Sequence, residues 1–286
     1  MIKVSVVVPC YNAEALVEAS FQTLLAQTLQ EMEFIYVDDG STDGTPQLLD
    51  SFAERDPRVR VVHQPNMRLG AARNTGIRHA QGEYVGFLDS DDVLSPNFYK
   101  ALYEAAKRHE ADIAWTGLMK RIYGRDVRWI QNFAEEREVN DLQERFDMLG
   151  FNYYVVSKVS RREFLLDNQL CLPERVLYED AQFTAKANLA AKMLVTVPGE
   201  AYYYIYNPKS IVNRRQTREA QIDRYNMIKG VVEMLKANNL RVPKRWQRLR
   251  KWSYYIGPIC LYKVRDCGWA DVYSLFDILP FWFKRN

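Results

Sequence analysis

The chain of 286 residues is 48% apolar and 26% charged, and it carries a formal net charge of +3. This length suits one large domain, or one domain with a smaller appended part. The chain contains no run of about 18 apolar residues, so the sequence does not predict a membrane-spanning helix. The four cysteines form no CxxC pair and the three histidines are scattered, which argues against a zinc site and favours free, reduced thiols. Because residues 1–5 lead directly into a strand-like run, without the apolar stretch and cleavage site of a signal peptide, we expect a cytoplasmic protein.

Apolar runs and helical spacing predict alternating strands and helices over the first part of the chain. The predicted strands are residues 3–9, 34–37, 59–62, 84–88 and 113–115, and the predicted helices are residues 13–28, 44–55, 69–80 and 97–109. We expect Asn12 to cap the first helix. Units of this kind form right-handed crossovers, so the pattern predicts an α/β fold with a Rossmann-like, mostly parallel sheet flanked by helices.

The pattern is weaker beyond Gly117, and the charge changes sign later still. Helices are predicted at residues 141–149, 179–192 and 217–238, with a strand at 201–206. Residues 1–206 contain 22 Lys/Arg and 30 Asp/Glu, whereas residues 207–286 contain 17 and 6. We therefore divide the chain into a domain of residues 1–206 and a helical, basic and aromatic extension of residues 207–286.

Polar clusters follow three of the predicted strands. They are Tyr11-Asn12, Asp38-Asp39 and the run of residues 89–92. In sheets of this type ligands bind beyond the carboxyl ends of the strands, so the sequence predicts a site at this edge.

Asp89, Asp91 and Asp92 bring three carboxylates within four residues. Such charges repel one another, and a hard divalent cation such as Mg²⁺ or Mn²⁺ would relieve the repulsion. The ion would take its other ligands from water and a diphosphate, and would offset the charge on a departing diphosphate. The alternative interpretation is a solvated turn or an acidic helix N-terminus.

Two other loops suit a nucleotide. Residues 38–44 lack the ligand spacing of an EF-hand, but Asp39 could accept hydrogen bonds from a nucleoside, with Asp43 as a cap or turn residue. Residues 66–76 form a loop of small residues entering a helix, from which Arg73 could reach a phosphate or ribose. Neither GxGxxG nor GxxxxGKS/T occurs, which argues against a Rossmann dehydrogenase and a P-loop NTPase.

Glu179-Asp180 opens an apolar helix and allows two interpretations. Acidic residues are common in the first turn of a helix. A carboxylate here could alternatively act as the general base that deprotonates an acceptor hydroxyl as it attacks an anomeric carbon.

Taken in order, these motifs resemble those of inverting family 2 glycosyltransferases with the GT-A fold. The similarity rests on the opening Val-Ser-Val-Val-Val-Pro-Cys-Tyr-Asn, on residues 37–45, on Gly70 to Gly76 and on Asp89-Ser90-Asp91-Asp92, and it covers roughly residues 1–117. Glu179-Asp180 is similar to a later acidic motif of the family. The resemblance implies that Pro9, Tyr11 and Glu14 line the nucleotide pocket, Asp39 holds the base or ribose, Arg73 and Asp89 contact the donor, Asp91 and Asp92 hold Mn²⁺ or Mg²⁺, and Asp180 is the base with Glu179 beside it.

The resemblance also implies a reaction. Residues 1–117 would bind the nucleotide-sugar donor, usually a UDP-sugar, and residues 118–206 would face a glycan or lipid-linked glycan acceptor. The expected reaction is a direct, inverting transfer to a hydroxyl group in bacterial surface polysaccharide or lipopolysaccharide assembly. Relatives often carry an Arg where this chain has Ile205-Tyr206, and Arg214 or Arg215 is a candidate replacement.

Two other functions compete with this one. A non-catalytic nucleotide-sugar or lipid-binding module is the first, although the intact acidic motifs argue against it. A nucleotidyltransferase is the second, although it would carry a Gly-rich phosphate loop where residues 9–12 stand.

Residues 243–286 combine four tryptophans with many Lys and Arg residues. Residues 272–283 are almost wholly apolar but too short to span a bilayer. One interpretation is peripheral association with the inner face of the cell membrane through anionic headgroups, and the other is a helical subdomain packed on the catalytic core. We do not expect nucleic acid as a partner, because residues 1–206 are acidic.

Overall fold

The computed structural model describes residues 1–150, 153–208, 210, 217–243 and 246, and the backbone of four strands between residues 253 and 284. It divides into two compact units, Met1–Met234 and Leu235–Asn286, which we describe separately. The division falls inside a helix, so the boundary that the charge distribution suggests after residue 206 lies within unit 1.

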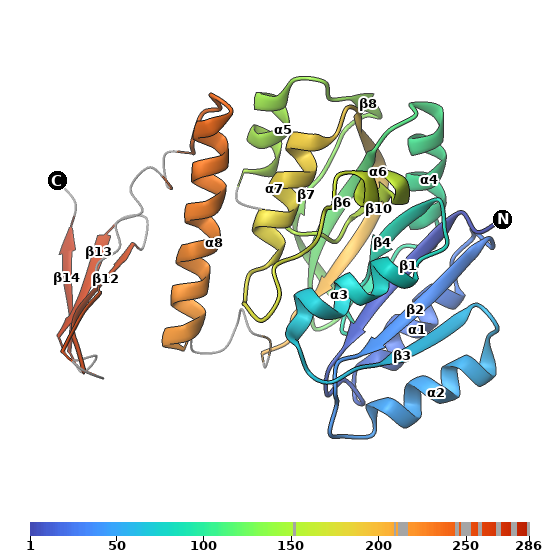
Figure 1. Ribbon diagram of the computed structural model, residues 1–286, viewed down its shortest axis with the longest axis horizontal. Coiled ribbons are helices and arrows are strands. Elements are labelled where there is room, and N and C mark those ends of the chain that lie inside the picture. Colours follow the sequence, from blue (N-terminus) through green and yellow to red (C-terminus); the bar gives the residue numbers. More distant parts are fainter. Residues whose placement is uncertain are drawn as a thin grey trace. The chain divides into compact units, whose positions relative to one another are not determined.

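A ten-stranded sheet forms the centre of unit 1 (Figure 1). Its order is β3-β2-β1-β4-β9-β6-β10-β5, with β7 paired to β6 and β8 paired to β10. Strands β1 to β4 run parallel, β9 runs antiparallel between β4 and β6, and β6 and β10 are parallel. The strands are β1 Val4–Cys10, β2 Met32–Asp38, β3 Val59–His63, β4 Tyr84–Phe87, β5 Val93–Leu94, β6 Ile113–Ile122, β7 Arg125–Gln131, β8 Arg137–Glu138, β9 Lys158–Arg161 and β10 Leu194–Ile205.

Helices cover both faces of this sheet. Tyr36 of β2 packs edge-on against Phe21 of α1 and Phe52 of α2. Gly76 of α3 instead lies against Val7 of β1, whose side chain points to the face opposite Tyr36. Helices α1 and α2 therefore cover one face and α3 covers the other. The helices are α1 Val17–Leu25, α2 Thr45–Arg55, α3 Arg68–His79, α4 Phe98–Arg108, α5 Leu142–Leu149, α6 Arg162–Asp167, α7 Asp180–Ala190 and α8 Arg218–Ala237.

The α/β fold with a mostly parallel, helix-flanked sheet is confirmed, but the predicted N-terminal cap is wrong. Helix α1 begins at Val17, after a turn, and its N-cap residue is Leu16. Asn12 adopts a left-handed conformation with φ of 49°, and its side-chain oxygen accepts a hydrogen bond from the Thr42 N–H at 2.8 Å. The side chain thus satisfies a neighbouring loop, a contact that local spacing does not reveal.

The first helix of the extension of residues 207–286 is α8, as expected. The last part of the extension, residues 253–284, forms strands and not the helical subdomain that we expected. Four antiparallel strands follow in the order β11-β12-β13-β14. They are β11 Ser253–Ile256, β12 Ile259–Asp266, β13 Ala270–Leu275 and β14 Leu279–Lys284. The Tyr, Phe, Trp, Val and Ile content of this stretch favours strands over helix. Among the described residues, no helix is both long enough and apolar enough to cross a membrane.

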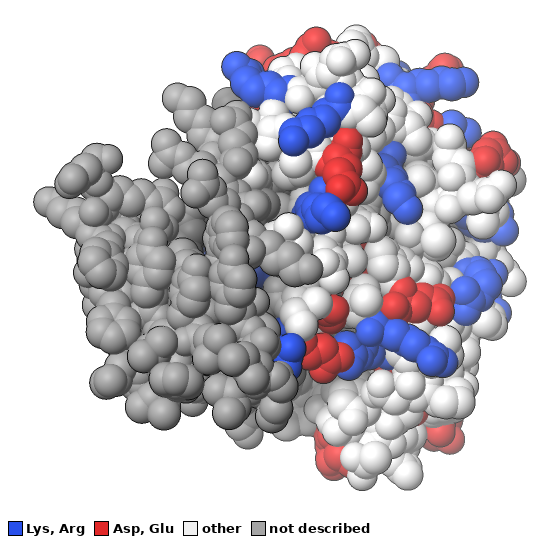
Figure 2. All heavy atoms as spheres, turned by 60° about the vertical axis from the view of Figure 1, so that its left-hand side comes forward, with Lys and Arg blue, Asp and Glu red and all other residues white. Residues whose placement is uncertain are grey.

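The described surface carries charges of both signs close together. Figure 2 shows one face, on which Lys and Arg side chains lie beside Asp and Glu side chains. Exposed pairs of this kind, such as Arg108 with Glu136, stabilise a fold by at most about 1 kcal/mol each.

Candidate active site

The carboxyl ends of the parallel strands meet at one edge of the sheet. The register pairs Cys10 with Asp38, and Val7 with Phe87, so the segments that follow β1, β2 and β4 begin side by side. The predicted clustering of polar residues at this edge is therefore confirmed. These segments carry Tyr11, Asp39, Asp89, Asp91 and Asp92.

Arg73 joins three of the predicted site residues. Its Nη1 donates to Glu179 Oε1 at 2.7 Å and to Asp180 Oδ1 at 2.6 Å, and its Nη2 donates to Asp89 Oδ1 at 2.7 Å. The guanidinium is only 1% exposed. Burial alone would lower the pKa of Arg73, but the three carboxylates outweigh it and hold the pKa above its usual value. Helix α3, the turn after β4 and the start of α7 therefore converge on one buried cation.

The two acids of the later motif differ in exposure. The Glu179 side chain is 5% exposed and the Asp180 side chain is 23% exposed. Burial, followed by the charge of Asp180, raises the pKa of Glu179 well above its usual range, with Arg73 opposing the shift. Asp180 is thus the carboxylate that can meet a substrate hydroxyl, whereas Glu179 lies behind it as a partner of Arg73.

Both carboxylate oxygens of Asp92 accept hydrogen bonds from other parts of the protein. Its Oδ2 accepts from the Tyr202 hydroxyl at 2.7 Å, and its Oδ1 accepts from the Ile205 N–H at 2.8 Å. The same hydroxyl accepts from the Asp89 N–H at 3.0 Å. Burial, followed by the charges of Asp89 and Asp91, raises the pKa of Asp92. Both Asp92 oxygens thus hold parts of the protein, and Asp92 shapes the acidic turn.

Asp91 has fewer partners from other residues. Its Oδ2 accepts from the Asn207 side chain at 3.1 Å, and its own backbone N–H also contacts the carboxylate. Burial, followed by the charge of Asp89, nevertheless raises the pKa of Asp91. A divalent cation would stabilise the charged form of this buried carboxylate. Because the described residues contain no group of three His, Cys, Asp or Glu side chains that could hold a metal, the ion would also need phosphate and water oxygens.

One carboxylate oxygen of Asp39 is held within the protein, and the other has no described donor. Its Oδ1 accepts from the Gln64 side chain at 2.7 Å and from the Met67 N–H at 2.9 Å. Gln64 is held in turn by the Thr75 hydroxyl, which donates to it at 2.6 Å. No described residue donates to Asp39 Oδ2, so this oxygen can accept a hydrogen bond from a base or ribose.

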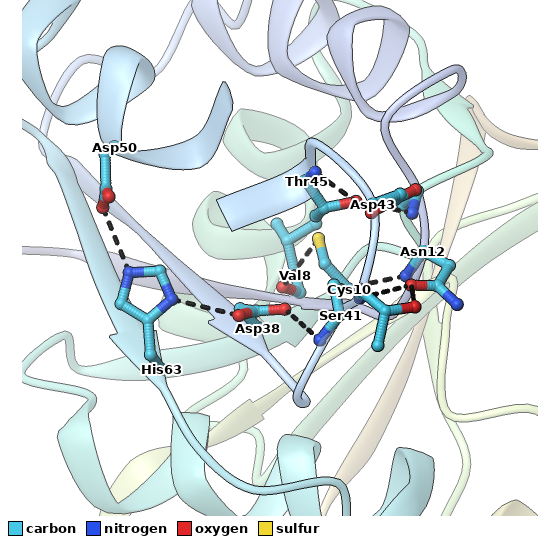
Figure 3. Close-up of polar contacts among 11 residues, drawn as sticks. Val8, Cys10, Asn12, Asp38, Ser41, Asp43, Thr45, Asp50 and His63 are labelled. Carbon is cyan, nitrogen blue, oxygen red and sulfur yellow. Dashed lines mark hydrogen bonds and ion pairs between the residues drawn. The ribbon is translucent and has the colours of Figure 1, made fainter. Parts of the chain in front are cut away.

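A second network supports the loop beside Asp39, as Figure 3 shows. His63 lies 3.0 Å from Asp38 Oδ2 and 3.1 Å from Asp50 Oδ1 through its two ring nitrogens. Asp38 Oδ1 accepts from the Ser41 N–H at 3.0 Å, and Ser41 Oγ accepts from the Asn12 N–H at 3.0 Å. The Asp38 hydrogen bond, and then that of Asp50, raise the pKa of His63 despite its partial burial. The ends of β1, β2 and β3 are thereby tied together.

Residues 5–167 match the family described as Glycosyl transferase family 2. The chain belongs to this family. Glycosyltransferase EpsJ of Bacillus subtilis is 34% identical over 215 residues, which is 73% of this chain and 62% of EpsJ. Glycosyltransferase EpsH of the same organism is 30% identical over 228 residues, which is 75% of this chain and 64% of EpsH. The matched regions thus span less than two thirds of either relative.

A solved structure has the same fold. Staphylococcus aureus TarS in complex with UDP-GlcNAc superposes with a TM-score of 0.67 at 28% identity, and the match covers 82% of this chain and 67% of TarS. The GT-A architecture that the resemblance implies is therefore shown for this member of glycosyl transferase family 2.

The three remaining residues assigned to the nucleotide pocket have distinct settings. Pro9 lies in β1 beyond the last residue paired with β4, where a missing N–H costs no ladder hydrogen bond. Tyr11 is 53% exposed and free to contact a ligand. Glu14 Oε2 accepts from the Gly44 N–H at 3.0 Å, and a Cβ at Gly44 would lie 2.4 Å from the Glu14 carboxylate. Glu14 therefore braces the loop before α2.

Sequence reasoning missed several residues of this candidate site. His63 and Gln64 lie at the carboxyl end of β3. The expectation that ligands bind beyond the carboxyl ends of the strands, which pointed to Asp39, could also have pointed to them. Tyr202 and Asn207 reach the acidic turn from β10 and the loop after it, and no local signal marks them. Arg214 and Arg215, the candidate replacements for the family Arg, lie outside the described residues.

Proposed function

We propose that this glycosyltransferase moves a sugar from a UDP-sugar to a hydroxyl group of a bacterial surface glycan, a lipopolysaccharide or a lipid-linked glycan, with inversion of the anomeric carbon. The observation that carries the proposal is the contact of Arg73 with both Asp89 and Asp180 at the sheet edge. TarS supports the donor class, since it is a poly(ribitol-phosphate) β-N-acetylglucosaminyltransferase whose structure contains UDP-GlcNAc.

The residues divide the reaction between them. Asp39 Oδ2 accepts a hydrogen bond from the nucleoside, beside the exposed ring of Tyr11. Asp180 takes the proton from the acceptor hydroxyl while its oxygen bonds to the anomeric carbon and the bond from that carbon to the diphosphate breaks. Arg73 contacts protein carboxylates through both Nη atoms, while its buried Nε has no partner among the described residues. We therefore assign Arg73 the alignment of Asp89 and Asp180 in addition to the donor contact expected from the family.

Asp91 is the residue that would hold Mn²⁺ or Mg²⁺. When bound, such an ion offsets the charge that develops on the diphosphate leaving group. Asp92, expected to share the ion, instead holds the turn through Tyr202 and Ile205, so we place it outside the first set of ligands.

The test is release of UDP from UDP-sugars in the presence of Mn²⁺ and an acceptor. We expect Asp91→Asn to lower kcat by at least about 100-fold, because the ion supplies several kcal/mol of transition-state stabilisation. Asp126→Asn is the matched control, since Asp126 is exposed and pairs with Arg121 on the β6–β7 hairpin. Activity that survives both Asp91→Asn and chelation would contradict the metal assignment. Nucleotide binding without turnover on any acceptor would favour the binding-module alternative.

The donor itself can be identified from stability. A nucleotide-sugar at about 100 times its Kd stabilises the folded state by about 2.7 kcal/mol. A panel of UDP-sugars with Mn²⁺ should therefore contain one that raises Tm more than UDP alone, and equal shifts for all of them would contradict a sugar-specific site.

We also propose a division of labour along the chain. Residues 1–206 would be the catalytic domain, with a donor half up to residue 117, and residues 207–286 would attach peripherally to the cytoplasmic face of the cell membrane. The Lys, Arg and aromatic content of residues 243–286 supports this proposal. Sedimentation of the full chain with anionic vesicles, reversed by high salt, is the expected result, and equal sedimentation with neutral vesicles would contradict it.

A further inference from the structure

The segment that precedes Asp180 has no regular secondary structure and is conformationally demanding. It spans residues 173–178. Arg175 and Tyr178 adopt left-handed conformations, with φ of 60° and 63°. Residues other than glycine adopt this conformation at a cost and keep it only when their surroundings impose it. The position of Asp180 therefore depends on the contacts that hold this segment.

Helix α3 holds the first half of the segment. The side-chain N–H of Asn74 donates to the Leu172 carbonyl at 2.9 Å and to Glu174 Oε1 at 3.0 Å, and its oxygen accepts from the Leu172 N–H at 2.8 Å. A Cβ at Gly70 would lie 2.2 Å from the Pro173 carbonyl oxygen, so the backbones meet closely. These contacts end before the left-handed residues.

Helix α8 holds the second half through Asp223. Asp223 Oδ2 accepts from the Leu177 N–H at 3.0 Å, directly beside Tyr178. The same oxygen lies 3.8 Å from Arg68 Nη1 at the start of α3. The Asp223 side chain is 14% exposed, so solvent screens this contact little.

Arg68, the second contact of Asp223, lies next to the residues that we assign to donor binding. Arg68 begins α3 with φ of 71°, and it follows Met67, whose N–H binds Asp39. Glu219, one turn before Asp223 on α8, also accepts from Arg68, at 2.5 Å, but its side chain is 60% exposed. Glu219 thus shares the partner of Asp223, but among the described residues it forms no hydrogen bond or ion pair with the segment before Asp180.

We propose that Asp223 is a positioning residue that fixes Leu177, and through it Asp180, and ties this segment to the start of α3. The proposal rests on the role of Asp180 as the base. The chemistry needs the base within hydrogen-bond reach of the acceptor hydroxyl, and a small displacement of Asp180 removes it from that position. Helix α8 accordingly contributes to the active site by positioning the base.

The experiment compares Asp223→Ala, Asp223→Asn and Glu219→Ala in the full chain. In Asp223→Ala we expect kcat to fall about tenfold or more, since misplacing a reacting group by about 1 Å can cost 100-fold, while KM for the UDP-sugar and Kd for UDP change little. Asp223→Asn keeps an oxygen for the Leu177 N–H and should restore most of kcat. Glu219→Ala removes an ion pair to the same arginine and should behave as the wild type.

Hydrogen exchange supplies a second measurement that needs no turnover. The Leu177 amide should exchange faster in Asp223→Ala than in the wild type, and not in Glu219→Ala. The proposal is overturned if Asp223→Ala keeps wild-type kcat, if Glu219→Ala loses as much kcat, or if UDP affinity falls in parallel with kcat. If the wild type transfers no sugar at all, the proposed function fails, and exchange at Leu177 still decides whether Asp223 holds the segment.

Discussion

The hydroxyl of Tyr202 donates a hydrogen bond to Asp92 at 2.7 Å. The two residues are 110 positions apart in the chain, on β10 and in the turn after β4. Because Tyr202 also accepts from the backbone of that turn, one buried phenol sets the direction in which the neighbouring carboxylates point. The acidic motif is therefore shaped by a strand that the motif itself does not contain.

Tyr202→Phe removes this hydroxyl without changing the ring. It leaves a buried carboxylate oxygen of Asp92 and the Asp89 N–H without their partner, so we expect a loss of about 1–3 kcal/mol in the free energy of unfolding. Urea denaturation measures the change. Tyr123→Phe is the control, because Tyr123 is 91% exposed and should change stability by less than about 0.5 kcal/mol. Equal effects of the two substitutions would contradict the role of Tyr202.

The pattern of apolar and polar residues predicted those site residues that directly follow a strand of the parallel sheet. The apolar runs that became β1, β2 and β4 are each long enough to be recognised, and the polar residues after them fall at one edge because parallel strands end together. Arg73 and Asp180 were likewise named from their motifs, and the structure brings them into contact.

The remaining features depend on contacts that sequence spacing does not encode. Strand β9 has four residues, of which Lys158 and Arg161 are charged, so no apolar period marks it. Three nearby aspartates look equivalent in sequence. Only the contacts from β10 and the loop after it distinguish Asp92, which binds Tyr202 and Ile205, from Asp91, which binds Asn207. Residues 253–284 form strands where a helix was expected, although their aromatic and β-branched content favours strands.

Arg73→Lys tests the buried cation that joins Asp89, Glu179 and Asp180. A lysine ammonium is a point charge and does not reproduce the guanidinium fork, so the three carboxylates lose part of their compensation. We expect a loss of about 3–5 kcal/mol in stability and no measurable transfer activity. Arg125→Lys, at an exposed position of β7, should retain both. Wild-type turnover by Arg73→Lys would refute this role.

His63→Gln tests the network in Figure 3 through its pH dependence. Asp38 and Asp50 raise the pKa of His63, so the stabilisation is complete below the unfolded pKa of about 6.5 and is lost as pH rises through the folded pKa. The ring is 44% exposed, which limits the effect to about 1 kcal/mol. The stability difference between wild type and His63→Gln should shrink from about pH 5.5 to about pH 8.5, and a constant difference would rule the network out as its source.

Lys158→Met tests a buried amine whose pKa shift makes stability rise with pH, whereas the shift of His63 makes stability fall with pH. Burial lowers the pKa of Lys158 to about 7, although Asp180 opposes the shift. Between about pH 7 and about pH 10.4 the unfolded chain binds a proton that the folded chain lacks, so this group makes stability rise with pH by up to about 1.4 kcal/mol per pH unit. Denaturation of Lys158→Met should show a correspondingly flatter pH profile. Parallel profiles would mean that Lys158 keeps its charge when buried.

The convergence of three chain segments on Arg73 has a consequence for how such enzymes diversify. In the reaction we propose, one guanidinium contacts both Asp89 on the donor side and Asp180 as the base, so helix α3 would set the distance between the two reacting partners. Loops that choose a different sugar or a different acceptor can therefore change without altering the spacing on which the displacement depends.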